Sequence, residues 1–298
     1  ACFSEQKHAT TSRLFIPAIR VIHGPMHLQL PDNRVLSLDR PLIMGILNVT
    51  PDSFSDGGAH DACDAAVAHG LAMAAEGADI IDVGGESTRP GSQRVPADEQ
   101  KRRVVEVIRA LRAKLDEQGD RGSRVAISID TTLADVAEAA LDTGAAILND
   151  VSAGREDERM FALAASHAAP IILMHMQGAP ATMQQNPAYD DVAAEVQAFL
   201  LERASAAMGA GMPHEQIVLD PGIGFGKTRE HNLKLVASLD RLVATGHAVL
   251  LGTSRKRFMG SICQVRDAAG HWVNPLPREL VGATCTTTAL GVLAGVRL

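Results

Sequence analysis

Carboxylate and amide side chains stand at the ends of three short, mainly apolar runs. Asp130, Asn149 and Asp220 occupy these positions, and a carboxylate or amide enclosed beside buried strands is costly without a hydrogen-bond partner. A single Asp of this kind is usually a structural cap, but three that converge on one sheet edge indicate a binding site. A planar heterocycle with an amino group and a ring N–H would supply the partner through paired hydrogen bonds.

A loop dense in side-chain oxygens follows the first apolar run, from Asn48 to Gly58. We expect its central segment to form a lid that closes over a ligand, with a surface turn that caps the next helix as the alternative. This segment consists of Thr50, Pro51, Asp52, Ser53 and Phe54. Asn48 and Asp52 carry the hard oxygen atoms that Mg²⁺ prefers beside a substrate phosphate.

A second loop, from Asp82 to Gly91, combines two glycines with Thr88, Arg89 and Pro90. Glycines at a strand end allow a ligand or a neighbouring backbone to approach closely, and an Arg beside hydroxyls suits a phosphate oxygen. The alternative is a helix cap with an exposed Arg. We favour the binding loop, because Pro90 and Gly91 would stiffen and aim it.

The segment from Asp220 to Thr228 contains three glycines and ends in Gly-Lys-Thr. It is one residue too short between the first glycine and Gly-Lys for a nucleotide-binding P-loop, so we reject that function. The glycines predict a tight turn that presents Phe225 to a flat substrate.

Three adjacent cations, Arg255, Lys256 and Arg257, follow the seventh apolar run. Such a cluster is usually a solvated surface, but at the mouth of a barrel it becomes a candidate clamp for an anion or a carbonyl. His175, which lies between two methionines, is open to two interpretations, a hydrogen-bonded inner histidine or a catalytic one.

The overall charge and the cysteines exclude several classes of protein. The formal net charge of −7 argues against broad binding to nucleic acid or to an anionic membrane. Four scattered cysteines without metal-ligand spacing predict reduced thiols in a cytoplasmic protein, and no apolar stretch is long enough to span a membrane. Residues 1–13 carry no pattern and are expected to be a flexible or added N-terminus.

Short apolar runs alternate with helix-like segments through most of the chain. The predicted strands are Leu42 to Val49, Ile80 to Gly84, Val125 to Ile129, Ala146 to Asn149, Ile171 to Met176, Ile217 to Asp220 and Val249 to Thr253. The predicted helices are Cys63 to Glu76, Asp98 to Gln118, Leu133 to Asp142, Asp191 to Met208 and Glu230 to Ala244, and their expected glycine caps are Gly77, Gly119, Gly144, Gly209 and Gly246.

This alternation predicts a parallel sheet within one domain, residues 14–298. An open doubly wound sheet would concentrate its site at one switch point, whereas here nearly every run ends in a polar residue. We therefore predict an α/β fold of the (β/α)8 TIM-barrel type. Turn residues between Leu14 and Arg40 predict a short β-hairpin that leads into the barrel.

Four motifs together resemble the dihydropteroate synthase family. They are Gly45 to Gly58, Asp82 to Gly91, Asp220 to Phe225 and Ser254 to Lys256. The likeness extends from about Pro41 to Leu298, in the family's order. It implies a TIM barrel that joins 4-aminobenzoate to (7,8-dihydropterin-6-yl)methyl diphosphate, releasing pyrophosphate in folate biosynthesis.

The resemblance also implies a role for each matching residue. The pterin would lie between Asp130, Asn149, Asp220 and Lys256. The 4-aminobenzoate would lie near Thr88, Arg89, Pro90, Phe225 and Lys256, and Asn48 would reach Mg²⁺ on the diphosphate. In the family mechanism diphosphate departs first and the amine attacks the resulting cation, so we expect Asp130 to favour the cation and Arg89 the departing diphosphate, with Lys256 as the third catalytic residue.

This sequence departs from the family pattern in two places. Relatives continue into an eighth strand whose Arg and His hold the diphosphate, whereas this sequence reaches Val296-Arg297-Leu298, so we expect a truncated eighth strand. Arg257 stands where many relatives have Ser near the aminobenzoate carboxylate, and a different local contact is expected.

Two other functions stay open at this point. One is a methyltransferase that holds methyltetrahydrofolate in the same barrel, and the other is a pterin-binding protein without catalysis. The apolar segment from Leu280 to Val296 would pack either on the barrel or on a partner, and the family resemblance implies a homodimer.

Overall fold

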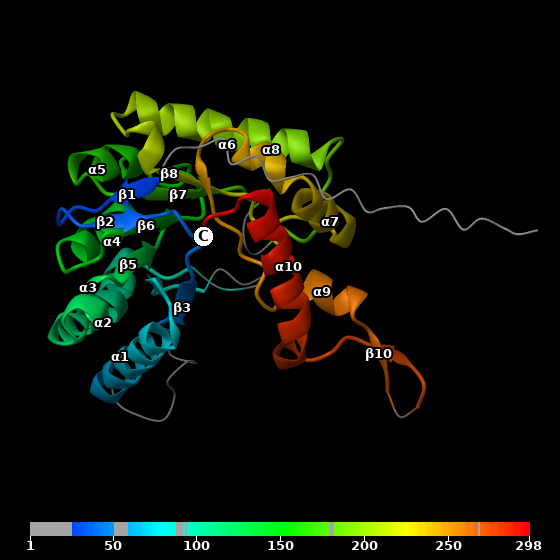
Figure 1. Cartoon of the computed structure of the whole chain (residues 1–298), viewed down its shortest axis with the longest axis horizontal. Coiled ribbons are helices and arrows are strands. Elements are labelled where there is room, and N and C mark those ends of the chain that lie inside the picture. Colours follow the sequence, from blue (N-terminus) through cyan, green and yellow to red (C-terminus); the bar gives the residue numbers. More distant parts are fainter. Residues whose placement is uncertain (1–25, 51–58, 88–91, 93, 179–181, 268) are drawn as a thin grey trace, which may run out of the picture.

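A parallel sheet, curled so that its two edge strands approach each other, forms the centre of the computed structural model (Figure 1). The structure describes residues 26–50, 59–87, 92, 94–178, 182–267 and 269–298. Within these ranges the sheet has seven strands that pair in chain order. The strands are β3 (Met44–Asn48), β4 (Ile80–Gly84), β5 (Ala126–Asp130), β6 (Ile147–Asp150), β7 (Ile171–Met174), β8 (Ile217–Asp220) and β9 (Ala248–Val249).

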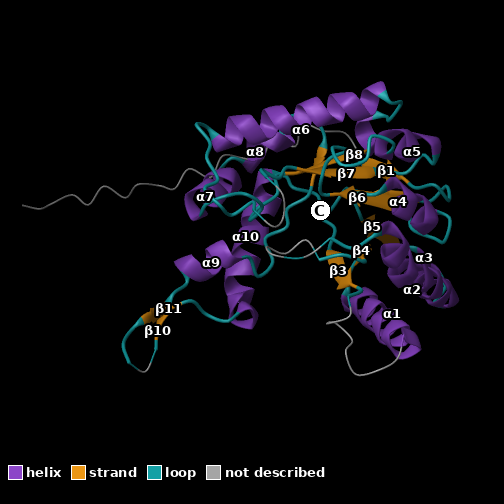
Figure 2. Cartoon of the chain, turned by 180° about the vertical axis from the view of Figure 1, so that it is seen from behind, coloured by secondary structure: helices purple, strands orange, loops and turns teal. Residues whose placement is uncertain are grey.

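Helices surround this sheet, most of them on its outer face, and the last two stand apart from its strands (Figure 2). They are α1 (Ala59–Glu76), α2 (Ala97–Glu117), α3 (Asp120–Ser123), α4 (Ala134–Leu141), α5 (Met160–Ser166), α6 (Val192–Gly209), α7 (Arg229–Ala237), α8 (Leu239–Val243), α9 (Arg257–Ile262) and α10 (Val281–Ala294), with short 3-10 turns at His214–Gln216 and Pro277–Leu280. In the part of the chain described, no helix is both long enough and apolar enough to cross a membrane.

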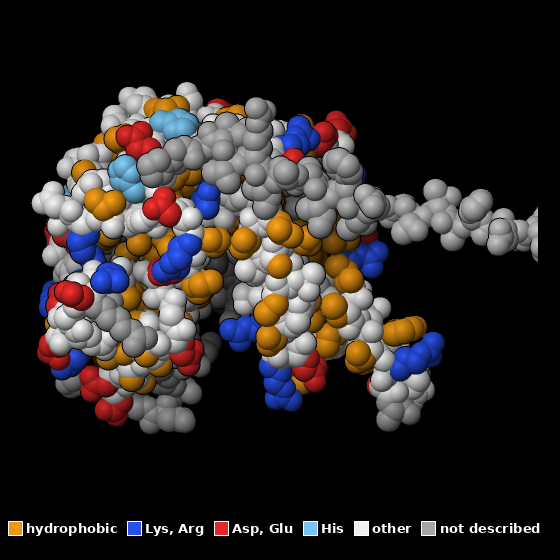
Figure 3. Space-filling view, viewed as in Figure 1, with side chains coloured by type: hydrophobic (Ala, Val, Ile, Leu, Met, Phe, Trp, Pro, Cys, Tyr) orange, Lys and Arg blue, Asp and Glu red, His pale blue; other side chains and the backbone are white. Residues whose placement is uncertain are grey.

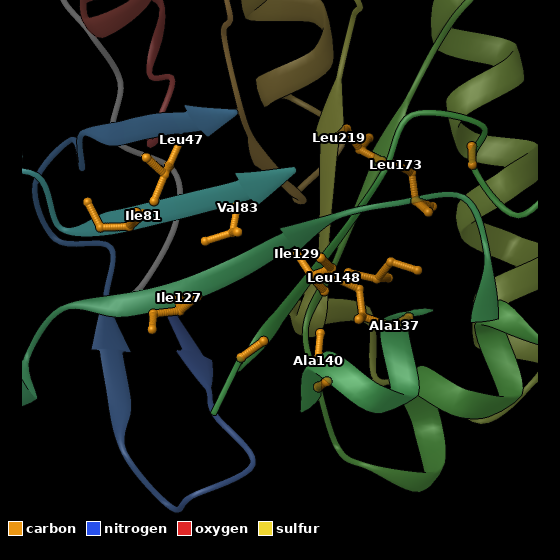
Figure 4. Packing of buried hydrophobic residues seen from close by; sticks show 14 of the residues in the cluster. Leu47, Ile81, Val83, Ile127, Ile129, Ala137, Ala140, Leu148, Leu173 and Leu219 are labelled. Carbon is orange, nitrogen blue, oxygen red and sulfur yellow. The ribbon is translucent and has the colours of Figure 1, made fainter. Parts of the chain in front are cut away.

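The outward-facing side chains of the strands pack against the helices in one continuous core. Figure 4 shows Leu47, Ile81 and Ile129 from neighbouring strands in this layer, and each is almost completely buried. The strands are apolar on this face because every second residue points to the helices. Burial of this layer holds the strand ends, and hence the polar residues after them, in a fixed order.

A hairpin of β1 (His27–Gln29) and β2 (Val35–Ser37) closes the amino end of the barrel. Leu28 and Leu38 of this segment are fully buried and pack with Ile80, Ile147 and other residues near the amino ends of the strands. The predicted lead-in hairpin is therefore confirmed from Met26 onward. Residues 1–25, including the expected flexible N-terminus, lie outside the described ranges.

The last residues of the chain occupy the place of an eighth strand. The Arg297 N–H donates to the Val249 carbonyl at 3.1 Å, and the Leu42 N–H donates to the Arg297 carbonyl at 2.8 Å. Just after β9, the Leu251 N–H also donates to the Leu298 carbonyl at 3.0 Å. These bonds bridge β9 to the segment before β3, so the predicted α/β barrel is confirmed.

Several predicted boundaries are wrong. The last strand of the central sheet covers Ala248–Val249, rather than Val249 to Thr253. The Leu250 N–H still donates to the Leu219 carbonyl, but the Leu251 N–H donates to the Leu298 carbonyl at the end of the chain, so pairing with β8 stops there. Ser238 breaks the predicted helix from Glu230 to Ala244 into α7 and α8.

One predicted cap, three short helices and one hairpin also differ from the prediction, and the unpredicted helices are α3, α5 and α9. Gly211, with φ of 102°, and not Gly209, is the left-handed residue after α6. A second hairpin, β10 (Val265–Arg266) with β11 (Trp272–Val273), was not predicted.

Candidate active site at the carboxyl ends of the strands

The strand register brings four of the strand-end residues into one row. Asn48 pairs with Gly84, Gly84 with Asp130, and Asp130 with Asn149. Register partners in a parallel sheet point to the same face. A Cβ placed on Gly84 would lie 3.5 Å from Asp130 Oδ2 and 3.8 Å from Asn48 Oδ1, so the glycine leaves room for the two oxygens to face the same space.

Asp82 forms a deeper polar layer beneath this row. It lies two residues before the end of β4, and its carboxylate is buried. It accepts hydrogen bonds from Ser128 Oγ at 2.6 Å and from Asn149 Nδ2 at 2.9 Å. Burial raises the pKa of Asp82, and these two hydrogen bonds oppose the rise. Asp82 therefore supports Asn149 from below.

Asp130 lies in surroundings that disfavour its negative charge. Burial, followed by the nearby carboxylates of Asp82, Asp150 and Glu86, raises its pKa well above the usual range. Such a site is short of positive charge, because several acids share one enclosed region. It therefore favours a ligand that carries or develops positive charge.

Asp150, the neighbour of Asn149 at the end of β6, has a structural role. Its carboxylate accepts from the Ser152 N–H at 2.8 Å, from Ser152 Oγ at 2.7 Å and from the Gly154 N–H at 2.6 Å. These bonds cap the turn after the strand. Of the two adjacent polar residues, Asn149 is the one available to the site.

Asp220 ends β8 and begins a tightly wound loop. Its Oδ1 accepts from the Gly222 N–H at 2.7 Å, and burial raises its pKa to about 6. Gly222, Gly224 and Gly226 have φ of 65°, 85° and 61°, a left-handed conformation that glycine adopts without steric cost. A Cβ on Gly222 would lie 1.9 Å from the His175 carbonyl oxygen, so the loop packs directly on the chain after β7.

The loop places Phe225 beside Lys256. The Lys256 ammonium lies 4.1 Å from the centre of the Phe225 ring, which is cation–π geometry. Burial lowers the pKa of Lys256, and Asp220 opposes this effect. The predicted neighbours Asp220, Phe225 and Lys256 are thus brought together.

The cation cluster does not act as a unit. Lys256 is half-buried, whereas Arg255 and Arg257 are exposed. Arg255 has φ of 55°, and its N–H donates to Thr284 Oγ1 on α10 at 3.3 Å. Among the described residues, Lys256 is the one predicted clamp residue that contacts the loop carrying Phe225.

His175 is an inner, hydrogen-bonded histidine rather than a mouth residue. It is buried, and Lys227 Nζ lies 2.9 Å from its Nδ1. Burial and then the positive charges of Lys227 and Arg155 lower its pKa to about 3. Burial also lowers the pKa of Lys227 to about 7. The contact joins residues 52 positions apart, and spacing along the chain gave no signal of it.

An apolar patch adjoins Phe225 at the mouth. Met174, Met176 and Met183 pack with Val151, and Phe225 lies against them. Methionine side chains adapt to irregular or planar surfaces. The patch could therefore receive a flat ring next to the polar row.

Most residues of the two predicted loops lie outside the described ranges. Pro51, Asp52, Ser53 and Phe54 of the lid, and Thr88, Arg89 and Pro90 of the second loop, lie outside the described residues. Thr50 is described and half-buried. The expected contacts of the remaining loop residues stay predictions.

The described part of the chain holds no group of three or more His, Cys, Asp or Glu side chains with metal-ligand geometry. Asn48 Oδ1 and Asp130 Oδ2 face the same space across Gly84. Amide and carboxylate oxygens suit a hard cation such as Mg²⁺ that keeps waters and substrate oxygens as further ligands.

Comparison with known proteins agrees with this geometry. Residues 44–298 match the family described as pterin binding enzyme. The dihydropteroate synthase of Mycobacterium leprae is 47% identical over 261 residues, covering 87% of each chain.

Two solved structures are similar over most of the fold. A dihydropteroate synthase from Xanthomonas albilineans with 4-aminobenzoic acid has a TM-score of 0.80 at 43% identity, covering 92% of each chain. A second structure from that organism, in complex with 7,8-dihydropteroate, has a TM-score of 0.76 at 41% identity, covering 91% of each chain. The chain therefore belongs to the pterin-binding enzyme family, and its relatives at this level of identity are dihydropteroate synthases.

Proposed function

We propose that the chain catalyses the dihydropteroate synthase reaction. In this reaction 4-aminobenzoate and (7,8-dihydropterin-6-yl)methyl diphosphate give 7,8-dihydropteroate and pyrophosphate. The observation that carries the proposal is the row of Asn48, Asp130 and Asn149 with Asp220 across the mouth. It accompanies extensive similarity to dihydropteroate synthases that were solved with 4-aminobenzoic acid and with 7,8-dihydropteroate.

Recognition of the pterin would rest on Asp130, Asn149, Asp220 and Lys256. The Asp220 carboxylate matches an amino group and a ring N–H through paired hydrogen bonds. A ring that lacks the 2-amino group would leave this buried acceptor unpaired, which is a large penalty. The aminobenzoate ring would lie near Phe225, with Thr88, Arg89 and Pro90 contributing from the second loop.

The chemistry needs charge stabilisation rather than a protein nucleophile. The bond between the methylene carbon and the diphosphate oxygen breaks first and leaves a cation spread over the pterin. The aromatic amine nitrogen then bonds to that carbon and loses one proton. Burial and the neighbouring acids raise the pKa of Asp130, and these acids support such a cation, because a preorganised field acts where charge develops.

Mg²⁺ is proposed as the cofactor. Asn48 would hold it through its amide oxygen, and the ion would supply positive charge to the departing diphosphate. Arg89 would assist at the same leaving group.

Three measurements separate this function from its competitors. Dihydropteroate synthase activity requires that both substrates are consumed and that pyrophosphate appears in equal amount with 7,8-dihydropteroate. Methyl transfer from methyltetrahydrofolate without pyrophosphate release would identify the methyltransferase. Calorimetric binding of the pterin diphosphate with no product would identify a binding protein without catalysis.

A homodimer is also proposed. Hydrophobic side chains gather over α10 in the space-filling view (Figure 3). Val281, Leu290, Val292 and Leu293 on this helix are between 42% and 61% exposed, and a contiguous apolar patch of this kind is typical of an interaction site. Sedimentation velocity should give a dimer, and Leu290→Glu should shift it to a monomer. A monomer in the unmodified chain would contradict the proposal.

A further inference from the structure

The loop from Asp220 to Gly226 turns several of its carbonyl groups inward. Three left-handed glycines reverse the chain within seven residues, and a Cβ on Gly226 would lie 2.4 Å from the Gln177 carbonyl oxygen. The Gly222 carbonyl accepts one hydrogen bond within the turn, from the Phe225 N–H at 3.1 Å. Its second lone pair and the Phe225 carbonyl can accept from a donor outside the turn, and a buried carbonyl left without a donor is costly.

Lys227 supplies that donor from the end of the same loop. Its Nζ lies 2.9 Å from the Gly222 carbonyl, 2.9 Å from the Phe225 carbonyl and 3.3 Å from the His175 carbonyl. A fourth contact, of 2.9 Å, joins it to His175 Nδ1. Lys227 therefore stands at the centre of the turn and ties it to the chain that follows β7.

The groups held by Lys227 belong to the residues that form the site. Gly222, whose carbonyl accepts from Lys227, donates its N–H to Asp220 Oδ1. Phe225, whose carbonyl also accepts, presents its ring 4.1 Å from the Lys256 ammonium. Lys227 itself is 3% exposed, so it acts through these neighbours and does not reach the mouth.

Two further hydrogen bonds hold the middle of the turn. Gly224 donates its N–H to Asn232 Oδ1 at 2.7 Å and accepts from Gln184 Nε2 at 2.6 Å. Both bonds end on Gly224, at the centre of the loop. Lys227 is thus the tie that holds both Gly222, next to the Asp220 end, and Phe225.

We propose that Lys227 is a positioning residue for the reaction, one that holds Phe225 and, less strongly, Asp220 in the geometry that binds the two substrates. The inference rests on the proposed function. The Phe225 side of the loop should depend on Lys227 more, because Asp220 is also held by its place in β8.

The test compares Lys227→Met and Lys227→Gln with the unmodified chain. Activity of the unmodified chain on the two substrates is measured first, since its absence would contradict the proposed function and not the role of Lys227. Lys227→Met keeps the length of the side chain and removes every donor, whereas Lys227→Gln keeps an amide donor. The KM for each substrate and kcat are then determined separately.

Lys227→Met should raise the KM for 4-aminobenzoate at least tenfold and raise the KM for the pterin diphosphate by a smaller factor. Lys227→Gln should recover part of the loss. A control variant at Leu115, a buried residue near the far end of α2, is chosen as Leu115→Val or Leu115→Ala to match the loss of stability in urea. It should leave both KM values within twofold.

Two results would overturn the inference. One is a folded Lys227→Met protein whose KM values for both substrates stay within twofold of the unmodified chain. The other is failure of both Lys227 variants to fold under conditions where the control folds, which would make Lys227 a residue of the folding core alone.

Discussion

Asn149 donates a hydrogen bond of 2.9 Å from Nδ2 to Asp82 Oδ2, and this contact determines which way its amide faces. With Nδ2 directed at the buried Asp82, the amide oxygen remains for the site. An acceptor in this position suits a ring N–H of the pterin. The specificity of one strand-end residue is thus set by a carboxylate in the layer below.

Replacing Asp82 by Ala should therefore raise the KM for the pterin diphosphate by about ten- to hundredfold, the range for a lost hydrogen bond to a charged group. It should also lower the pKa of Asp130, because one of the carboxylates that raise it is removed. Steady-state kinetics on folded protein measures the first effect. Ser128→Ala, which leaves the Asn149 contact intact, is the control, and an unchanged KM in Asp82→Ala would contradict the assignment.

The contact between Phe225 and Lys256 should contribute to aminobenzoate binding. Phe225→Leu removes the ring beside the ammonium and should raise the KM for 4-aminobenzoate about two- to thirtyfold, as expected for a partly desolvated cation–π contact. Phe161→Leu is a matched control, since Arg203 lies over the Phe161 ring at 5.2 Å and neither residue is a predicted substrate contact. Equal effects of the two substitutions on KM would speak against a specific role.

Asp220 should give the reaction an acid limb. Its pKa is raised to about 6, and pterin recognition needs the carboxylate, so activity is present above this value and falls as the pH drops through it. The kcat/KM for the pterin diphosphate, at saturating 4-aminobenzoate, should fall about tenfold per pH unit below pH 6. Asp220→Asn should remove this limb. A flat profile between pH 7 and pH 5 would refute the prediction.

A stacked pair of histidines at the amino end of the barrel should make the fold sensitive to acid. The His214 and His247 rings lie 3.8 Å apart. His247 is buried, and its Nδ1 has no hydrogen-bond partner among the described residues. Burial, and then His214, lowers the pKa of His247 from 6.5 to about 4.

Because this pKa is lowered on folding, the stabilisation is complete above pH 6.5 and is lost as the pH falls towards 4. Between pH 7 and pH 5 the free energy of unfolding of the unmodified chain should fall by about 2 kcal/mol more than that of His247→Phe. Urea unfolding at the two pH values measures the difference. Identical losses would mean that His247 is not the group responsible.

Asn48 should control the response to Mg²⁺. The proposed ligand set predicts that chelation abolishes turnover and that Asn48→Ala raises the Mg²⁺ concentration for half-maximal rate about tenfold, roughly one lost ligand. Titration of Mg²⁺ at fixed substrate gives this concentration. Full activity after chelation would remove Mg²⁺ from the account.

The sequence predicted the barrel well where local pattern and buried strands agree. Ile80 to Gly84 and Ile217 to Asp220 were predicted with the bounds that β4 and β8 have. A continuous apolar run specifies such strands because both of their faces are buried. The bounds of β9 could not be predicted in this way, because its extent depends on the end of the chain, which pairs with Leu251.

The polar row was predictable because Asn48, Asp130 and Asn149 lie at the carboxyl ends of apolar runs. Its supports were not, because they arise from contacts between distant segments. Asp82 reaches Asn149 across 67 positions and Lys227 reaches His175 across 52. Neither pair has a spacing rule: strand pairing brings Asp82 to Asn149, and the glycine turn after β8 brings Lys227 to His175.

The most direct test follows pyrophosphate and 7,8-dihydropteroate together over one time course, with the pterin diphosphate, 4-aminobenzoate and Mg²⁺ supplied. We predict that the two products appear in a ratio of one to one and that Asp130→Asn lowers both rates by the same large factor. Pterin binding without either product, or an unchanged rate in Asp130→Asn, would contradict the account of this site.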